Sequence, residues 1–195
     1  SAWVPTLECY HGVVSLDHRL YGSLEIDGQT VAFAEGRGYI EKDWGQSFPQ
    51  AWVWLQSNHF EQAGTCLTAS TAVIPWRKSA FVGFIVGLWH EGRLYRFATY
   101  TGAKTEHLAV TEETVDWVLR SKTHRLHILA QRGADSQYGL LKGPTTMEMG
   151  KRVAETLSAT VQVVLTDLEG GEVFAGNGRF AGLEVYNAAA LLEFK

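Results

Sequence analysis

The chain has 195 residues, of which 46% are hydrophobic and 12% aromatic, and its formal net charge is −4. This composition can bury a substantial core and excludes a disordered chain. The net negative charge gives the phosphate backbone no overall attraction, so we expect no nucleic-acid partner. No apolar run reaches the roughly 18 residues of a membrane-spanning helix, so we also expect no membrane span.

Two cysteines, Cys9 and Cys66, are too few for a disulfide framework. We expect both to be free thiols in a cytoplasmic protein, because nothing in the composition indicates an oxidising compartment and no signal peptide is recognisable. A single structural disulfide is the less favoured alternative. No cluster of cysteine and histidine has the spacing of a zinc site, and we expect neither a metal nor a cofactor.

Turn residues recur at short intervals, and extended patterns rich in β-branched and aromatic residues lie between them. These patterns predict strands over residues 7–16, 19–26, 29–34, 52–60, 65–74, 81–90, 93–100, 114–121, 124–131, 158–166 and 178–186. Asp27-Gly28 predicts a hairpin turn, because both residues accept positive φ. Residues 147–157 could form a short helix, but apolar residues alternate through Leu165, which favours one long strand with Glu155 pointing inward.

Ten or more short strands without a long helix predict an all-β fold, either an antiparallel barrel or a sandwich. Glycines within the predicted strands favour the barrel, because they suit the bends of a closed sheet. These glycines are Gly22, Gly83, Gly87 and Gly182. No linker or repeat divides the chain, so we predict a single barrel domain over residues 1–195.

The most distinctive stretch is residues 36–60, which we call the signature segment. It combines acidic residues, a histidine, amides and large aromatic residues between glycines and a proline. If residues 52–60 are extended, one face carries Trp52, Trp54, Gln56, Asn58 and Phe60, and the other carries Val53, Leu55, Ser57 and His59. Neither face is purely apolar, which indicates polar groups that serve a cavity or a buried hydrogen-bond network.

The signature segment, GRGYIEKDWGQSFPQAWVWLQSNHF, resembles that of the tocopherol cyclase-like family, whose wider relatives include carotenoid hydratases. Residues 8–12 (ECYHG), 81–84 (FVGF) and 96–103 (RFATYTGA) resemble further family segments in the expected order. The resemblance implies a lipocalin-like β-barrel, usually one of two in a longer polypeptide. We therefore expect this chain to be the C-terminal barrel and an N-terminal barrel to be its partner.

The resemblance also implies cofactor-independent, acid-catalysed cyclisation or hydration of a prenylated hydrophobic substrate, such as a prenylquinol or a terpenoid. Protonating a carbon–carbon double bond requires an acid in a dry pocket, and aromatic faces can shelter the resulting carbocation. Burial can keep a carboxylic acid protonated, and our candidates are Asp43, which we favour, Glu41 and Glu155. The side chains expected to line the pocket are Tyr39, Trp44, Trp52, Trp54, Gln56 and Asn58.

Two other interpretations stay open: a barrel that only binds a lipophilic molecule, and a structural half-domain that completes a partner barrel. Glu41-Lys42-Asp43 also fits a solvated surface turn, with Trp44 closing one end of the barrel. A cavity-facing carboxyl with a raised pKa would favour the enzyme, and an apolar cavity without one would favour the binding protein. A solidly packed barrel with an exposed apolar patch would favour the structural role.

Overall fold

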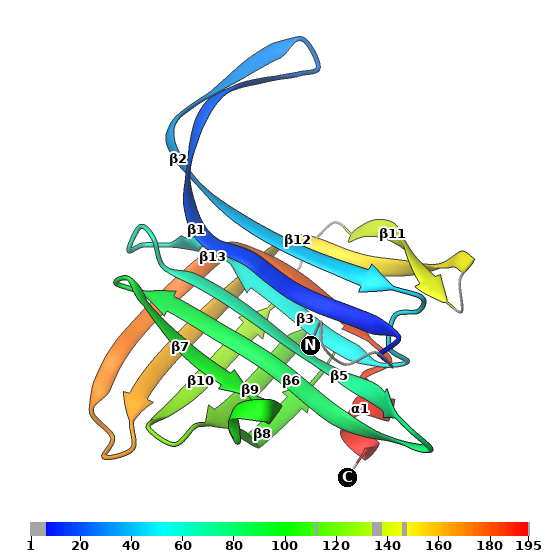
Figure 1. Cartoon of the computed structure of the whole chain (residues 1–195). Coiled ribbons are helices and arrows are strands. Elements are labelled where there is room, and N and C mark those ends of the chain that lie inside the picture. The colour runs from blue at the N-terminus through cyan, green and yellow to red at the C-terminus, as the bar shows by residue number, and fades with distance from the viewer. Residues whose placement is uncertain (1–6, 112, 134–137, 146–147, 195) are drawn as a thin grey trace.

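The computed structural model describes residues 7–111, 113–133, 138–145 and 148–194 (Figure 1). Most of this part of the chain is strand, with one short 3-10 helix (Thr99–Thr101) and a six-residue helix, α1 (Ala188–Glu193). The strands in chain order are β1 (Cys9–Ile26), β2 (Gln29–Gly45), β3 (Trp52–Ser57), β4 (His59–Phe60), β5 (Cys66–Trp76), β6 (Ser79–His90), β7 (Arg93–Ala98), β8 (Lys104–Val110), β9 (Thr114–Arg120), β10 (His124–Gln131), β11 (Tyr138–Thr145), β12 (Glu148–Asp167) and β13 (Glu172–Tyr186). The predicted all-β fold with ten or more strands is confirmed.

One antiparallel sheet curls into a nearly closed, lipocalin-like barrel (Figure 1). Its strands are hydrogen-bonded in the order β7-β6-β5-β3-β13-β12-β10-β9-β8, and β11 and β4 pair additionally with β12 and β13. None of the helices in the described part of the chain is long and apolar enough to cross a membrane.

The barrel interior is filled by side chains from alternate positions of these strands. On β3, Val53 and Leu55 are fully buried. On the opposite wall, Trp117 of β9 is also fully buried, and its ring meets Phe84 edge-on with centroids 6.0 Å apart. Each large side chain buried in this way contributes roughly 1.5–3 kcal/mol to stability.

Strands β1 and β2 form a separate two-stranded sheet, the β1–β2 hairpin, which lies along the outer face of the barrel and projects beyond it (Figure 1). The predicted turn is confirmed, with positive φ at Asp27 and Gly28. The two strands predicted over residues 7–16 and 19–26 are one strand, β1. Register shifts such as that between Val13 and Ser15 bend the strand without ending it.

The N-terminal part of the signature segment is strand rather than turn, because β2 continues to Gly45. On β2, Glu41 faces the barrel, where Thr68 of β5 donates a hydrogen bond to it, and the alternation of the strand turns Trp44 away. Trp44 is 40% exposed and stacks on Tyr10 of β1. The expectation that Trp44 closes one end of the barrel is therefore wrong, and so is the solvated turn proposed for Glu41.

Strand β12 confirms the prediction of one long strand, but its faces are not those we expected. A register shift between Thr156 and Ala159 changes which residues point inward. Thr156 and Ala159 are fully buried, whereas Leu157 is 66% exposed. Glu155 consequently lies on the outer face and not in the interior, which corrects the sequence-based expectation.

Strand β3 ends at Ser57, and the alternation predicted for residues 52–60 holds only as far as that residue. After Asn58 the short strand β4 pairs with β13. Phe60 is buried in the core and His59 is exposed. In a continuous strand the two would have the opposite orientations, with His59 facing the core and Phe60 facing outward. Both cysteines are free thiols, as predicted.

Candidate active site

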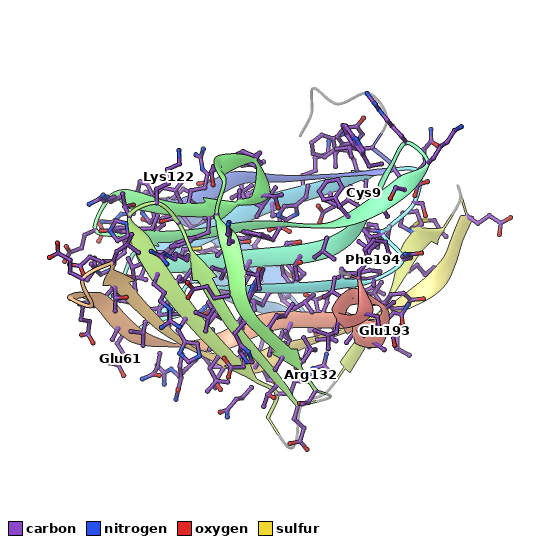
Figure 2. All side chains as sticks on the ribbon, turned by 90° about the horizontal axis from the view of Figure 1, so that it is seen from below. Cys9, Glu61, Lys122, Arg132, Glu193 and Phe194 are labelled. Carbon is purple, nitrogen blue, oxygen red and sulfur yellow. The ribbon has the colours of Figure 1, made fainter. Side chains whose placement is uncertain are left out.

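A pocket of about 540 Å³ lies between the outer face of the barrel and the base of the β1–β2 hairpin. Its volume is within the range of small-molecule sites, and apolar and aromatic side chains dominate its lining. Figure 2 labels Cys9, a lining residue, on the hairpin side of the barrel, away from Glu61 and Arg132. The pocket thus lies outside the barrel, not in the filled interior where ligands of small β-barrels are usually held.

The floor of the pocket is built by cross-strand pairs on the outer face of the sheet. Trp54 of β3 is paired with Ser70 of β5 on one side and with Glu184 of β13 on the other. Glu184 is in turn paired with Glu155 of β12. Directly paired residues point to the same face of a sheet, so the row faces outward while Val53 and Leu55 face the core.

Aromatic side chains surround this row. Trp52 stacks on Tyr186 with ring centroids 4.5 Å apart. Phe48, in the connection between β2 and β3, meets Trp52 edge-on at 5.6 Å, and its backbone N–H donates to the carbonyl of Pro144. Trp76 and Phe81 are partly exposed at the rim. Such faces attract a cationic carbon centre placed over them.

Among the described residues, Glu184 is the carboxyl group whose surroundings most strongly favour its neutral form. Burial raises the pKa of Glu184 to about 7; a hydrogen bond from Trp52 Nε1 to Glu184 Oε2, 2.8 Å long, opposes this rise. The neighbouring carboxyl groups of Glu155, Asp43 and Glu41 raise it further. A carboxyl with this pKa is partly protonated at neutral pH and can act as a general acid.

Sequence reasoning missed Glu184. Within the predicted strand over residues 178–186 it alternates with the apolar Leu183 and Val185, a pattern typical of a solvated outer position. Only the pairing of β13 with β3 places it between the two tryptophans. A glutamate on the outer face of a strand is ordinarily solvated, so the sequence pattern around Glu184 does not distinguish it from a surface residue. No local signal indicates its role.

A second polar group joins the hairpin to the pocket: His11 of β1 with Glu41 and Asp43 of β2. His11 is paired with Asp43 in the hairpin, and its Nδ1 lies 2.8 Å from Asp43 Oδ1 and 3.5 Å from Glu41 Oε1. Burial lowers the pKa of His11, but the hydrogen bond with Asp43 and the two negative charges together raise it above its ordinary value. His11 was also missed, because only the hairpin register brings it to residues 41 and 43.

Glu41 is held by hydroxyl donors. Tyr39 donates a hydrogen bond to Glu41 Oε2, and Thr68 donates to the same oxygen at 3.3 Å. Burial raises the pKa of Glu41, while the charge of His11 and the hydrogen bond from Tyr39 oppose the rise. Burial and the carboxylate also raise the pKa of Tyr39, which therefore remains a neutral donor.

The same three residues could hold a metal ion. His11 Nδ1 and one oxygen each from Glu41 and Asp43 lie within 4.8 Å of one another, and within the described residues this is the only such group. Imidazole and carboxylate ligands suit several divalent cations. The sequence pattern gave no sign that these three residues meet. The expected absence of a metal stays a prediction.

Of the nine site residues predicted from the sequence, four line the pocket: Glu41, Asp43, Trp52 and Trp54. Tyr39 is not a lining residue but donates a hydrogen bond to Glu41. The others do not line it. Trp44 faces away, Gln56 donates to Cys66 Sγ at 3.7 Å, Asn58 lies at the break after β3, and Glu155 lies beside Glu184 in the sheet. Burial raises the pKa of Glu155.

Comparison with known proteins supports the resemblance found in the sequence. The chain is 29% identical over 133 residues to a probable chloroplastic tocopherol cyclase of Oryza sativa subsp. japonica, and 27% identical over 135 residues to a chloroplastic tocopherol cyclase of Zea mays. Each alignment covers 66% of this chain but only 27% of the length of the relative. No solved structure matches. A model of the tocopherol cyclase-like family matches residues 2–186, and the chain belongs to that family.

Proposed function

We propose that the pocket binds a prenylated hydrophobic substrate and that Glu184 protonates a carbon–carbon double bond of this substrate, which leads to cyclisation or hydration without a cofactor. The observation that carries the proposal is the position of Glu184, a half-buried carboxyl with a pKa of about 7 on the wall of an aromatic pocket. The names of the two plant relatives agree with this chemistry.

Glu184 is a better proton donor than Asp43, the residue favoured from the sequence. The side chain of Asp43 is 34% exposed, and its contact with His11 makes it the acceptor when His11 is charged. Glu155 does not line the pocket. Efficient general acids have a pKa near the working pH, which is the condition that Glu184 meets.

In the proposed step the carboxyl proton of Glu184 forms a new C–H bond with the electron pair of the double bond. This leaves a tertiary carbocation, which the faces of Trp52 and Trp54 stabilise. A hydroxyl group of the substrate, or water, then forms a C–O bond to the carbocation. The proton lost from that oxygen returns to a carboxylate of the pocket, so that no proton is consumed overall.

Trp54 offers a further contact for such a ligand. Its indole ring lines the pocket, and a hydrogen bond from Trp54 to Glu41 opposes the rise in the pKa of that carboxyl group. The half-buried ring can pack against the aromatic ring of a prenylated quinol.

The test is turnover in deuterated water. We expect the protein to convert a prenylated quinol or an acyclic terpenoid, with one deuterium per product molecule at the protonated carbon. Glu184→Gln should lower turnover by about 100-fold or more, with the Kd changed only a few-fold. Glu172→Gln, at the exposed start of the same strand, is the matched control. Full turnover in Glu184→Gln would exclude Glu184, and product without deuterium would exclude protonation.

A second candidate function is the structural half-domain, and two observations favour it. The interior of the barrel is packed, as this interpretation required. In addition, Leu24, Ile26 and Val31 are exposed on one face of the projecting part of the hairpin. On this view the chain is the C-terminal barrel of a two-barrel protein, and the absence of both ligand binding and turnover in this chain alone would support it.

A further inference from the structure

A second cavity of about 330 Å³ lies beside the first, between strand β1 and strands β5, β6 and β7. Val13, Val14, Ser15 and Leu16 of β1 line one side of it, and the outer face of β5, β6 and β7 lines the other. The two cavities share three lining residues: His11, Ile85 and Tyr100. Because the same three side chains bound both, the cavities adjoin each other.

A glycine, Gly87, helps to keep the second cavity open at its floor. Gly87 of β6 is paired with Thr68 and with Arg96, so it occupies an outer-face position. A Cβ atom at Gly87 would lie 3.2 Å from Leu94 Cδ1, so any larger side chain there would press against Leu94 or extend into the cavity. On the other side, the register shift after Val13 bends β1 beside the cavity.

The chemistry of the lining changes between the two cavities. The carboxyl groups and most of the aromatic rings belong to the first cavity, whereas Val13, Leu16 and Leu94 give the second an aliphatic wall. At its β7 end lies Arg96, whose exposed side chain can cover an apolar chain with its stem and keep its charged group in water.

We infer that the two cavities form one groove, in which the second holds the apolar chain of the ligand whose reactive part occupies the first. The ligand is therefore an extended molecule, with a compact polar head and an aliphatic chain that runs beside β1. The inference takes the position of the head from the proposed function, but the groove itself depends only on the adjoining cavities and their lining.

Chain length should consequently control affinity. Each methylene group that is fully removed from water improves the Kd about fourfold. The second cavity is bounded partly by exposed side chains, so we expect a smaller gain, about tenfold per isoprene unit until the cavity is full. A ligand held in the first cavity alone would show no gain beyond the shortest chain.

The experiment measures Kd by calorimetry for quinols that carry one to four isoprene units, and for quinols with unbranched chains of matched length. In Gly87→Val and in Val13→Phe, which narrow the second cavity from opposite sides, the advantage of the longer chains should fall at least tenfold. The Kd of the shortest ligand should stay unchanged. Val164→Phe, a partly exposed position on β12 that lines neither cavity, is the matched control and should keep the normal dependence.

The same dependence on chain length in both narrowed variants as in the unmodified protein would overturn the groove. Turnover with no dependence on chain length would also overturn it, while leaving the protonation by Glu184 in place. Dependence on chain length without turnover would support the groove and contradict the proposed chemistry. An affinity that rises with chain length in either series of quinols supports the groove. The series with the steeper rise identifies whether the groove accepts a branched or an unbranched chain.

Discussion

Strand β3 presents Val53 and Leu55 to the barrel interior, and Trp52 and Trp54 to the outer face. The interior face contacts aliphatic and aromatic side chains and is closed to water. The outer face meets carboxyl groups, an imidazole and a pocket beneath the β1–β2 hairpin. Adjacent residues of one strand therefore serve stability and chemistry separately, and substitutions on the two faces should change different measured quantities.

The largest expected effect is on the interior. Trp117 is fully buried, and its Nε1 donates to Thr105 Oγ1 at 3.1 Å. Trp117→Ala should lower the free energy of unfolding by about 3–5 kcal/mol, measured by urea denaturation. Trp54→Ala on the outer face should cost only about 1–2 kcal/mol but should weaken ligand binding. Equal losses of stability in the two variants would contradict the division between the faces.

The outer face should carry a pH dependence that Glu184 controls. The pKa of Glu184 is raised from 4.5 to about 7, so the folded state holds this proton more tightly than the unfolded state. The stabilisation is complete below about pH 4.5 and is lost as the pH rises through about 7, by an amount on the order of 2 kcal/mol. Glu184→Gln should therefore gain stability relative to the unmodified protein between pH 5 and pH 8.

Urea denaturation of both proteins across this range gives the difference, and Glu172→Gln corrects for a general change of charge. Since His11 and Glu41 also have raised pKa values, both proteins should lose stability as the pH rises. The diagnostic quantity is the difference between them. A difference that does not change with pH would mean that Glu184 is ionised throughout, and would remove the basis for its role as the acid.

The smallest effect concerns Trp44, which faces away from the barrel. It is 40% exposed, stacks on Tyr10, and has Lys42 Nζ 5.4 Å from its ring centre. An exposed aromatic pair of this kind contributes about 0.5–1.5 kcal/mol. Trp44→Ala should lower the free energy of unfolding by no more than this and leave ligand binding unchanged. A loss of 3 kcal/mol or more would indicate that Trp44 is buried, as expected from the sequence.

The fold was predictable because its signals are local. Strand patterns alternate within a few residues, and the Asp27-Gly28 turn depends on the φ values that these two residues accept. The faces of the strands were predictable only where no bulge or break intervenes. The bulge after Thr156 reversed the side of β12 on which Glu155 lies, and the break at Asn58 did the same for Phe60.

The site was less accessible to sequence reasoning, because its parts come from distant strands. Trp52 and Glu184 are 132 positions apart and meet only through the pairing of β3 with β13. His11 reaches Asp43 through a hairpin register that includes several shifts. The signature segment contains Glu41, Asp43, Trp52 and Trp54, which line the pocket, but only the order of strands in the sheet adds Glu184 to them.

The β1–β2 hairpin carries His11, Glu41 and Asp43, whereas Glu184 and the tryptophans Trp52 and Trp54 belong to the barrel. Within the described residues the backbone hydrogen bonds of β1 and β2 form a sheet of their own. Sheets that are not joined by a hydrogen-bond ladder can open with different free energies. Amide hydrogen exchange should consequently be faster in the hairpin than in β3 and β13, and the site can come apart while the barrel remains folded.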